Sequence, residues 1–343
     1  MSRFIQLHLL TFFPPANLNR DDTGRPKTAV VGGVTRLRLS SQALKRAWRT
    51  SPVFAAALAD HMGQRTQRLG EEVLTYLTGK GMAADKALAT ARDIAGVFGK
   101  IKPEGARIEQ LAFIAPEEKA AALELADKAL AGEKIEAKKA GLLRTADTAA
   151  DIALFGRMLA DDPDYNREAA AQVAHAITTH KVVVEDDYYT AVDDLKTSAE
   201  DAGAGFLGEA AFGSGVFYLY LCIDTALLAK NLGGDSVLAK TAVRALIEAA
   251  ATTAPRGKQN SFAAHGRAGY ILAEKGDRQP RTLAGAFARP VKGEDLMAAS
   301  VEALVDFRDA IDKAYNDGEP EPAAVMHVGK EGSLRAVLDF IGG

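Results

Sequence analysis

A long alanine- and leucine-rich stretch separates two groups of strand-like segments in this chain. From about residue 52 to residue 172, apolar residues recur at helical spacing and strand signals are almost absent. The clearest helical patterns cover residues 53–69, 84–98 and 117–130. Segments rich in Val, Ile, Thr, Tyr and Phe stand on both sides, at residues 3–13, 174–184 and 215–224. This order predicts a helical subdomain inserted into a sheet-containing domain.

The remaining segments complete a mixed α+β pattern. Pro14-Pro15 is expected to end the first strand, and residues 185–214 form an excursion that is too long for a tight turn. Further helices are predicted at residues 236–252 and 294–315, and further strands at residues 261–273 and 280–290. We therefore predict an open antiparallel sheet of the ferredoxin or RNA-recognition type, with helices on one side only.

Length and composition are those of a globular protein with a substantial core. The 343 residues allow two domains, or one domain with a large insertion, and 48% of them are hydrophobic. The single cysteine, Cys222, excludes an internal disulfide and is expected to be a buried thiol in a reducing compartment. The apolar segment at residues 4–13 is too short to span a bilayer, so a cytoplasmic location without membrane contact is expected.

Residues 36–49 combine a strand pattern with a strongly amphipathic helix. Arg and Leu alternate up to Leu39, Ser40 or Ser41 can cap a helix, and the helix is expected to begin at Gln42. At about 100° per residue, one helix face is polar and basic and the other is apolar. The polar face holds Gln42, Lys45, Arg46 and Arg49, and the apolar face holds Leu44, Ala47 and Trp48.

Positive charge is concentrated around this helix. Residues 20–49 contain eight basic and two acidic residues, a net charge of +6, whereas the whole chain carries −3. Lys and Arg provide charge, Ser and Gln provide hydrogen bonds, and a helix start provides N–H donors, which is the mixture that holds a phosphate backbone. The alternative is an ordinary solvated helix that follows an exposed edge strand.

Other patterns do not support catalysis or a bound cofactor. Residues 203–208 spell G-x-G-x-x-G but precede a predicted strand, whereas a dinucleotide fingerprint precedes a helix. The six histidines include no pair at i, i+4, and one cysteine cannot build a zinc site, so we expect no metal and no cofactor. No G-x-S-x-G motif supports a hydrolase. The acidic doublets, such as Asp21-Asp22, are more typical of solvated turns than of a carboxylate pair.

Several segments resemble the backbone subunit of the type I-E CRISPR Cascade complex, the CasC family. They follow the order of that family from residue 4 to about residue 263. The matching segments are Phe4–His8, Leu18–Asp22, Gly32-Gly33, Arg38–Ala47, Asp151–Met158, Ala174–His180, Thr190–Leu195 and Ser214–Tyr218.

The resemblance implies a hand-like subunit that polymerises along a guide RNA. Its palm would comprise residues 1–54, 173–184 and 215–343, its helical fingers residues 55–172, and its thumb residues 185–214. The implied partners are the guide RNA, target DNA through the guide, further copies of the chain and other Cascade subunits. The subunit would be a scaffold and not an enzyme.

The same resemblance implies roles for individual side chains. Guide phosphates would be held by Arg20, Lys27, Ser40, Gln42, Lys45, Arg49 and Lys258. A displaced nucleotide would be flanked by Met158, Tyr189, Thr190 and Val192. A second basic cluster in the fingers, Lys134, Lys138 and Lys139, would lie near target DNA, or is simply a solvated helix face. The alternative function is a ribonuclease like the type III backbone subunits, in which a loop aspartate, here Asp21 or Asp22, cleaves RNA.

Overall fold

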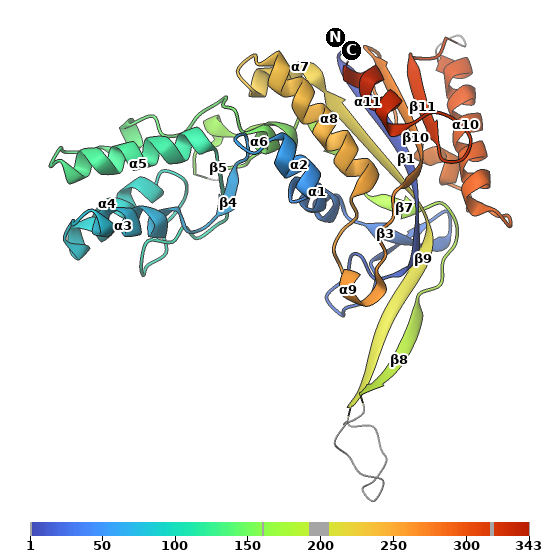
Figure 1. Cartoon of the computed structure of the whole chain (residues 1–343), viewed down its shortest axis with the longest axis horizontal. Coiled ribbons are helices and arrows are strands. Elements are labelled where there is room, and N and C mark those ends of the chain that lie inside the picture. Colours follow the sequence, from blue (N-terminus) through green and yellow to red (C-terminus); the bar gives the residue numbers. More distant parts are fainter. Residues whose placement is uncertain (1, 160, 192–205, 316–318, 343) are drawn as a thin grey trace, which may run out of the picture. The chain divides into compact units, whose positions relative to one another are not determined.

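The computed structural model describes residues 2–159, 161–191, 206–315 and 319–342 (Figure 1). Two compact units divide these residues. The helical unit consists of residues 52–172 and 223–245, and the sheet unit consists of residues 2–51, 173–222 and 246–343. Strand β9 and helix α8 contribute residues to both units. Each unit therefore combines segments that are distant in the sequence.

The sheet unit is built on a large antiparallel sheet. The main path through the sheet has the order β11-β10-β1-β9-β7-β3-β2, and β6 and β8 also pair with β9. The strands are β1 (Phe4–Ala16), β2 (Thr28–Val31), β3 (Val34–Leu39), β6 (Ala171–Val173), β7 (Ala176–Thr178), β8 (Glu185–Ala191), β9 (Phe206–Asp224), β10 (Ala268–Gly276) and β11 (Ala323–His327). The predicted α+β class with an antiparallel sheet is confirmed.

Strand β1 is longer than the sequence pattern predicts. It continues through Pro14-Pro15 to Ala16, so the prediction that these prolines end the strand is wrong. The register with β10 runs from Phe4 opposite Gly276 to Thr11 opposite Ala268 and goes no further. A proline lacks an N–H donor, and past Thr11 no donor is needed toward β10, so a proline that faces β10 costs no hydrogen bond between strands.

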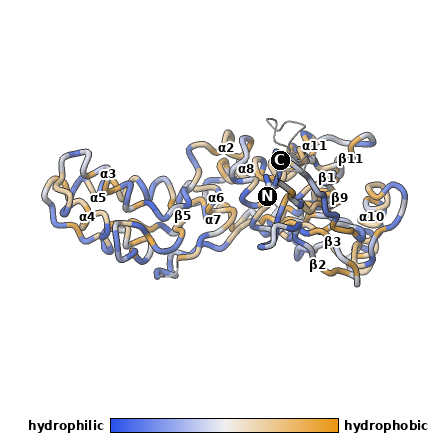
Figure 2. Tube along the Cα trace, turned by 90° about the horizontal axis from the view of Figure 1, so that it is seen from below, coloured by the Kyte–Doolittle hydropathy of each residue, from blue (hydrophilic) through white to orange (hydrophobic). Residues whose placement is uncertain are grey.

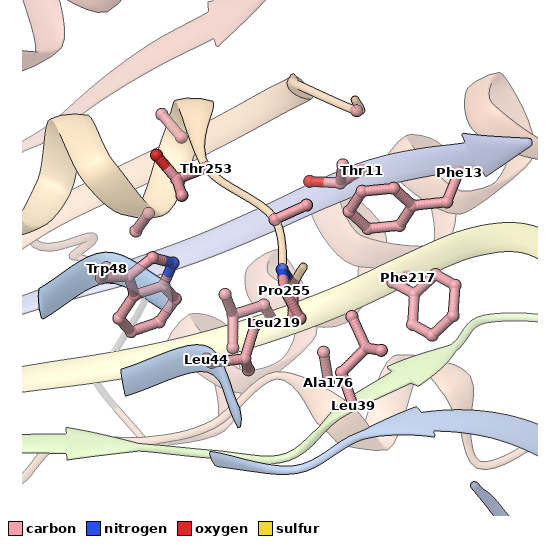
Figure 3. A pocket seen from close by; sticks show the side chains of 14 residues that line it. Thr11, Phe13, Leu39, Leu44, Trp48, Ala176, Phe217, Leu219, Thr253 and Pro255 are labelled. Atoms are coloured by element: carbon pink, nitrogen blue, oxygen red, sulfur yellow. The ribbon is translucent and has the colours of Figure 1, made fainter. Parts of the chain in front are cut away.

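Helices cover both faces of this sheet, so the expectation of helices on one side only is wrong. On one face α1 (Ser41–Arg49) and the end of α8 (Ser236–Thr252) pack on strand residues. Figure 3 shows Leu44 and Trp48 of α1 beside Leu39 and Leu219 of the sheet. On the other face η3 (Ala284–Phe287) and α10 (Leu296–Tyr315) bury a second apolar cluster. Both faces of the central strands are therefore core, which explains the nearly continuous apolar run of β1.

A buried polar network lies beneath α10. The Nδ1 atom of His8 is 2.9 Å from Tyr218 Oη, and its Nε2 atom is 3.5 Å from Glu274 Oε2. Arg281 and Arg308 donate hydrogen bonds to the Glu274 carboxylate at 2.8–3.2 Å. Each buried charge thus has an opposite charge beside it, as burial in a medium of low dielectric requires.

The C-terminal part of the sheet unit differs from expectation. Residues 280–290 contain the 3-10 helix η3 where a strand was predicted, and the segment at residues 174–184 contributes only the three residues of β7. Strand β11 and helix α11 (Leu334–Gly342) were not predicted. A short helix, α9 (Gln259–Phe262), precedes β10.

The helical unit is built around three helices that share one apolar core. Helices α3, α4 and α5 lie side by side in Figure 1, and their inward residues form one buried cluster. In Figure 2 these helices alternate between hydrophilic and hydrophobic residues, as amphipathic helices do. The elements of this unit are α2 (Pro52–Ala57), β4 (Gln64–Thr66), α3 (Leu69–Gly79), α4 (Ala84–Ala95), β5 (Ala112–Ile114), α5 (Pro116–Leu130), η1 (Ala137–Lys139), α6 (Ala150–Phe155), η2 (Pro163–Tyr165) and α7 (Thr225–Asn231).

The helix predicted at residues 53–69 is too long. Helix α2 ends at Ala57, and Gln64–Thr66 form strand β4, which pairs with β5. The patterns at residues 84–98 and 117–130 correspond to α4 and α5. No helix among the described residues combines the length and the hydropathy needed to cross a membrane.

Candidate nucleic-acid interface

Helix α1 presents the basic face that the sequence predicts. Its N-cap is Ser40, whose side chain accepts a hydrogen bond from the Ala43 N–H at 3.4 Å, and the helix begins at Ser41, one residue before the expected start. The first turn contains no acidic residue. Its N-terminal N–H groups and helix dipole therefore favour an anion.

The polar face of α1 is open to solvent to different degrees. Gln42 is exposed, whereas Lys45 and Arg49 are half-buried. Partial burial lowers the pKa of Lys45, because it disfavours the charged ammonium. A negative charge beside Lys45 would favour the charged form again.

The loop at residues 17–27 is fixed against α1 and β3 by hydrogen bonds. The Asn19 side-chain oxygen accepts from the Ser40 N–H at 2.8 Å. The Lys27 N–H donates to the Asn19 carbonyl at 2.8 Å, and the Lys27 carbonyl accepts from the Arg38 N–H at 2.8 Å. Arg20, which forms an isolated bridge with Pro26, remains exposed. This loop therefore holds Arg20 and Lys27 on a fixed backbone.

Asp21 organises the tip of the same loop. Its Oδ1 atom accepts hydrogen bonds from the Thr23 N–H, the Thr23 hydroxyl and the Arg25 N–H at 2.8–3.0 Å. The hydrogen bond from Thr23 is the main cause that lowers the pKa of this carboxyl. Asp21 thus acts as a turn-stabilising carboxylate.

A second basic loop, at residues 255–259, lies against the first. A β-carbon on Gly257 would stand 2.3 Å from the Leu18 carbonyl oxygen and 2.7 Å from that of Asn17, so only glycine allows this approach. The next residue, Lys258, adopts a left-handed conformation with φ of 49°. Arg256 donates to the Thr50 carbonyl at the end of α1.

The first loop, Lys258 of the second loop and residues 209–211 of β9, among them the acidic Glu209, line a hollow of about 340 Å³ in the sheet unit. Arg20 and Lys258, which are distant in the sequence, both line it. Lys27 lines a neighbouring, smaller hollow with Arg38. The structure therefore brings Arg20 and Lys258 together at one hollow, with Lys27 at the adjoining one. Ser40, Gln42, Lys45 and Arg49 belong to α1 in the same unit.

Arg36 is not part of the basic surface, although it belongs to the basic stretch of the sequence. Its side chain is buried, and it donates to the carbonyl oxygens of Thr178 at 2.7 Å and Phe287 at 3.0 Å. Burial lowers the pKa of this guanidinium. Arg36 therefore joins the sheet to η3 and is unavailable to a phosphate.

The excursion at residues 185–214 is a β-hairpin as far as the structure describes it. Strand β8 pairs with the first part of β9 from Glu185 opposite Phe212 to Ala191 opposite Phe206, so β9 begins well before the expected residue 215 (Figure 1). The Tyr189 ring lies over Gly208, and Thr190 is exposed. Val192 lies outside the described residues.

Arg25 joins the base of this hairpin to the first loop. Its guanidinium contacts the Asp186 carboxylate of β8 at 2.7 and 3.3 Å, and Glu209 of β9 lies at 4.0 Å. The Asn17 amide also donates to the Ala211 carbonyl of β9 at 2.9 Å. Arg25, Asn17, Asn19 and Gly257 were not predicted as site residues. Arg25 belongs to the counted basic stretch, but its partner could not be known from the sequence.

The remaining predicted site residues belong to the helical unit. Met158 is 81% exposed and stands on the segment that follows α6. Lys134, Lys138 and Lys139 are all exposed around η1, and Lys139 pairs with Glu136 at 2.5 Å. Lys138 also lines a hollow that contains Asp161 and Asp162, so this surface has mixed charge.

The described residues contain no group of three His, Cys, Asp or Glu that could hold a metal ion. The described residues thus form an α+β protein in which basic side chains from two loops gather on the sheet unit. The model of the CT1975-like protein family matches residues 5–337. The chain therefore belongs to the CT1975-like family.

Solved structures share the fold over nearly the whole chain. A chain of a "CRISPR RNA-guided surveillance complex, pre-nicking" has a TM-score of 0.82 and 30% sequence identity, and the match covers 97% of this chain and 95% of that one. A chain of a second CRISPR RNA-guided surveillance complex has a TM-score of 0.73 and 25% identity, with 98% of each chain covered. No curated protein sequence matches significantly.

Proposed function

We propose that this protein is the guide-RNA-binding backbone subunit of a type I-E CRISPR Cascade complex. The observation that supports this most is the likeness, over 97% of the chain, to a chain of an RNA-guided surveillance complex. The basic loops of the sheet unit supply a suitable surface, because Arg20 and Lys258 line one hollow and Lys27 the next. A cytoplasmic location and membership of an antiviral ribonucleoprotein follow from this proposal.

The subunit would hold the guide through its phosphates and leave sequence recognition to base pairing. Lys45, Arg49 and Lys258 supply charge, whereas Ser40 and Gln42 supply hydrogen bonds at the start of α1. Such contacts fix the position of a strand but carry no sequence information. Guide bases remain available to target DNA, in the division of labour known from RNA-guided effectors of another type.

Successive copies would divide the guide into short segments. Met158, together with Tyr189, Thr190 and Val192 of the hairpin, would flank a displaced nucleotide, and each hairpin would contact the RNA of the neighbouring copy. Repetition along the RNA would generate a helical filament that other Cascade subunits complete. Lys134, Lys138 and Lys139 would lie near the target strand. No covalent bond changes in this proposal, so the subunit is not an enzyme.

Salt-dependent RNA binding tests the proposal. We expect RNA to co-purify with the protein, and we expect Lys45→Ala with Arg49→Ala to reduce the slope of log K against log salt by about one to two. Lys330→Ala removes an exposed lysine of the sheet unit that lies outside the proposed surface, and serves as the matched control. Equal affinities and slopes for the double variant and wild type would mean that the helix face is only solvated.

The ribonuclease alternative is less favoured by the geometry of Asp21. One of its oxygens already accepts three hydrogen bonds within its own turn. Asp21→Asn with Asp22→Asn keeps an oxygen acceptor at both positions, so the turn should survive. We expect the variant to bind RNA as wild type does, and neither protein to cleave it. Cleavage by wild type that the variant lacks would establish the ribonuclease and overturn the scaffold.

A further inference from the structure

Met158 is held outward between two buried neighbours. Its side chain is 81% exposed, whereas Arg157 is 5% exposed and Leu159 is 6% exposed. A single exposed apolar residue is common on protein surfaces and assigns nothing by itself. What distinguishes Met158 is the framework that fixes the residues on both sides of it.

The Arg157 guanidinium is buried and surrounded by hydrogen-bond acceptors. Nη1 donates to both carboxylate oxygens of Glu118 at 2.6 and 2.8 Å and to the Phe113 carbonyl at 3.2 Å. Nη2 donates to the carbonyls of Arg144 at 3.0 Å and Tyr165 at 3.3 Å. The side chains of Arg157 and Glu118 are 1% and 0% exposed. Rotating Arg157 would break all these contacts and leave a buried carboxylate without its counter-charge.

The backbone on both sides of Met158 is also fixed. Arg157 and Arg167 exchange two backbone hydrogen bonds at 3.1 and 2.8 Å. On the other side, the Leu159 N–H donates to the Asn166 side-chain oxygen at 2.6 Å. Gly156 has a φ of 80°, and a β-carbon there would stand 2.9 Å from the Arg167 carbonyl oxygen. Met158 therefore projects from a braced segment.

We infer that Arg157 and Asn166 are positioning residues, which fix the backbone on both sides of Met158 so that its side chain projects outward and keeps a nucleotide out of the base stack. This inference rests on the proposed function and extends it to residues that do not touch RNA. A methionine side chain is flexible. Stacked bases resist an inserted side chain, here called a wedge, and push it aside if it can move away. A wedge needs support that is harder to deform than the stack it interrupts, and the buried Arg157–Glu118 ion pair with its additional carbonyl acceptors supplies it.

Fluorescence of 2-aminopurine tests the inference, because this base brightens when it leaves a stack. Single-stranded RNAs that carry it at one position at a time would be bound to the full-length chain. We expect wild type to brighten it at regularly spaced positions and Met158→Ala to abolish the effect. Asn166→Ala and Arg157→Lys should reduce the signal toward that of Met158→Ala, while the RNA dissociation constant stays within about twofold.

A matched control separates positioning from loss of stability. Val73 is fully buried in the core of the helical unit, on α3, so Val73→Ala lowers stability without touching the bracing contacts. It should keep the wild-type fluorescence. Asn166 is exposed, so Asn166→Ala should fold even if the Arg157 variant does not.

Two results would contradict the inference, and they have different consequences for the proposed function. Normal fluorescence in Asn166→Ala and Arg157→Lys, with a lost signal in Met158→Ala, would overturn the positioning role alone. Normal fluorescence in Met158→Ala would mean that Met158 displaces no nucleotide, which removes both the positioning role and the part of Met158 in the proposed function. The salt-slope experiment on α1 would still report phosphate binding independently.

Discussion

The side-chain oxygen of Asn19 accepts a hydrogen bond from the backbone N–H of Ser40 at 2.8 Å. Ser40 is the N-cap of α1, and Asn19 precedes Arg20 in the first basic loop. One hydrogen bond therefore fixes the start of the basic helix relative to the basic loop. The two parts of the proposed phosphate-binding surface are joined through this contact.

Asn19→Ala should weaken both the fold and RNA binding. The variant leaves the Ser40 N–H without this acceptor, and we expect the free energy of unfolding to fall by about 1–3 kcal/mol. Urea unfolding can be followed by Trp48, the single tryptophan, which lies on the buried face of α1. Asn19→Asp retains an acceptor and should lose less stability. Equal stability of Asn19→Ala and wild type would show that the contact is dispensable.

Gly257→Ala should separate the two basic loops. The added β-carbon would overlap the Leu18 carbonyl, so the backbone at residues 255–259 must move away from residues 17–18. We expect weaker RNA binding even though no charge is lost, measured by titration with labelled RNA. Gly79→Ala, at a helix position where a β-carbon has nothing within 4 Å, should bind as wild type does. Unchanged binding by Gly257→Ala would refute the role of this close approach.

The Arg25–Asp186 pair can be tested by exchanging its charges. If Arg25 acts by joining the first loop to the hairpin, Arg25→Asp and Asp186→Arg should each weaken RNA binding, and the double exchange should restore much of it. If Arg25 instead binds phosphate itself, the double exchange should not restore binding, and Asp186→Ala should strengthen it. Both side chains are part-exposed, so the effect on stability should be small.

Stability should fall as the solution is acidified, and His8 should contribute to this. Burial lowers the pKa of His8, an effect that Glu274 only partly offsets, so the unfolded chain binds this proton more tightly than the folded protein. The contribution of His8 is thus complete above its unfolded pKa of about 6.5 and is lost as the pH falls below it. His8→Gln should flatten the pH dependence of urea unfolding between about pH 7 and pH 5. An unchanged slope would contradict the prediction.

Glu274 should act in a lower pH range. Burial opposes its ionisation, but His8 and Arg281 more than offset this and lower its pKa to about 2. Its contribution, on the order of 3 kcal/mol, is present above the unfolded pKa of about 4.5 and disappears as the pH falls toward 2. Unfolding curves of wild type between pH 5 and pH 2 should show this second loss. Glu274→Gln should lack it and should already be less stable at pH 7, because Arg281 and Arg308 then share only the carboxylate of Asp312.

Sequence periodicity correctly predicted the helices and strands that are defined by their own residues and not by distant partners. The α8 prediction matches the observed bounds, and α1 differs by one residue, because each helix has a clean apolar pattern and a capping side chain before it, Ser40 for α1 and Asp235 for α8. Residues 53–69 were wrongly assigned to one helix, because Gln64–Thr66 pair with β5, a partner that local pattern does not reveal. The 3-10 helix at residues 284–287 and the long β9 likewise depend on distant contacts.

The sequence identified the basic residues of the candidate site, but it did not show how the fold arranges them in space. Charge counting found the basic stretch, yet it could not separate Arg36, which is buried under carbonyl acceptors, from Arg20, which is exposed. Nor could it find Gly257, whose importance lies in the Leu18 carbonyl beside it. Nothing tests the individual RNA contacts, so these stay predictions.

The pairing of β1 with β10 has a consequence for synthesis on the ribosome. Phe4 meets Gly276, so the first strand to emerge cannot complete its hydrogen bonds until more than two hundred further residues have been translated. Meanwhile Leu7, Leu9 and Leu10, which the finished fold buries completely, remain exposed on the nascent chain. Such long-range closure is slow and exposes the chain to aggregation. Yield in recombinant expression should therefore depend on translation speed and on chaperones that shield this first strand.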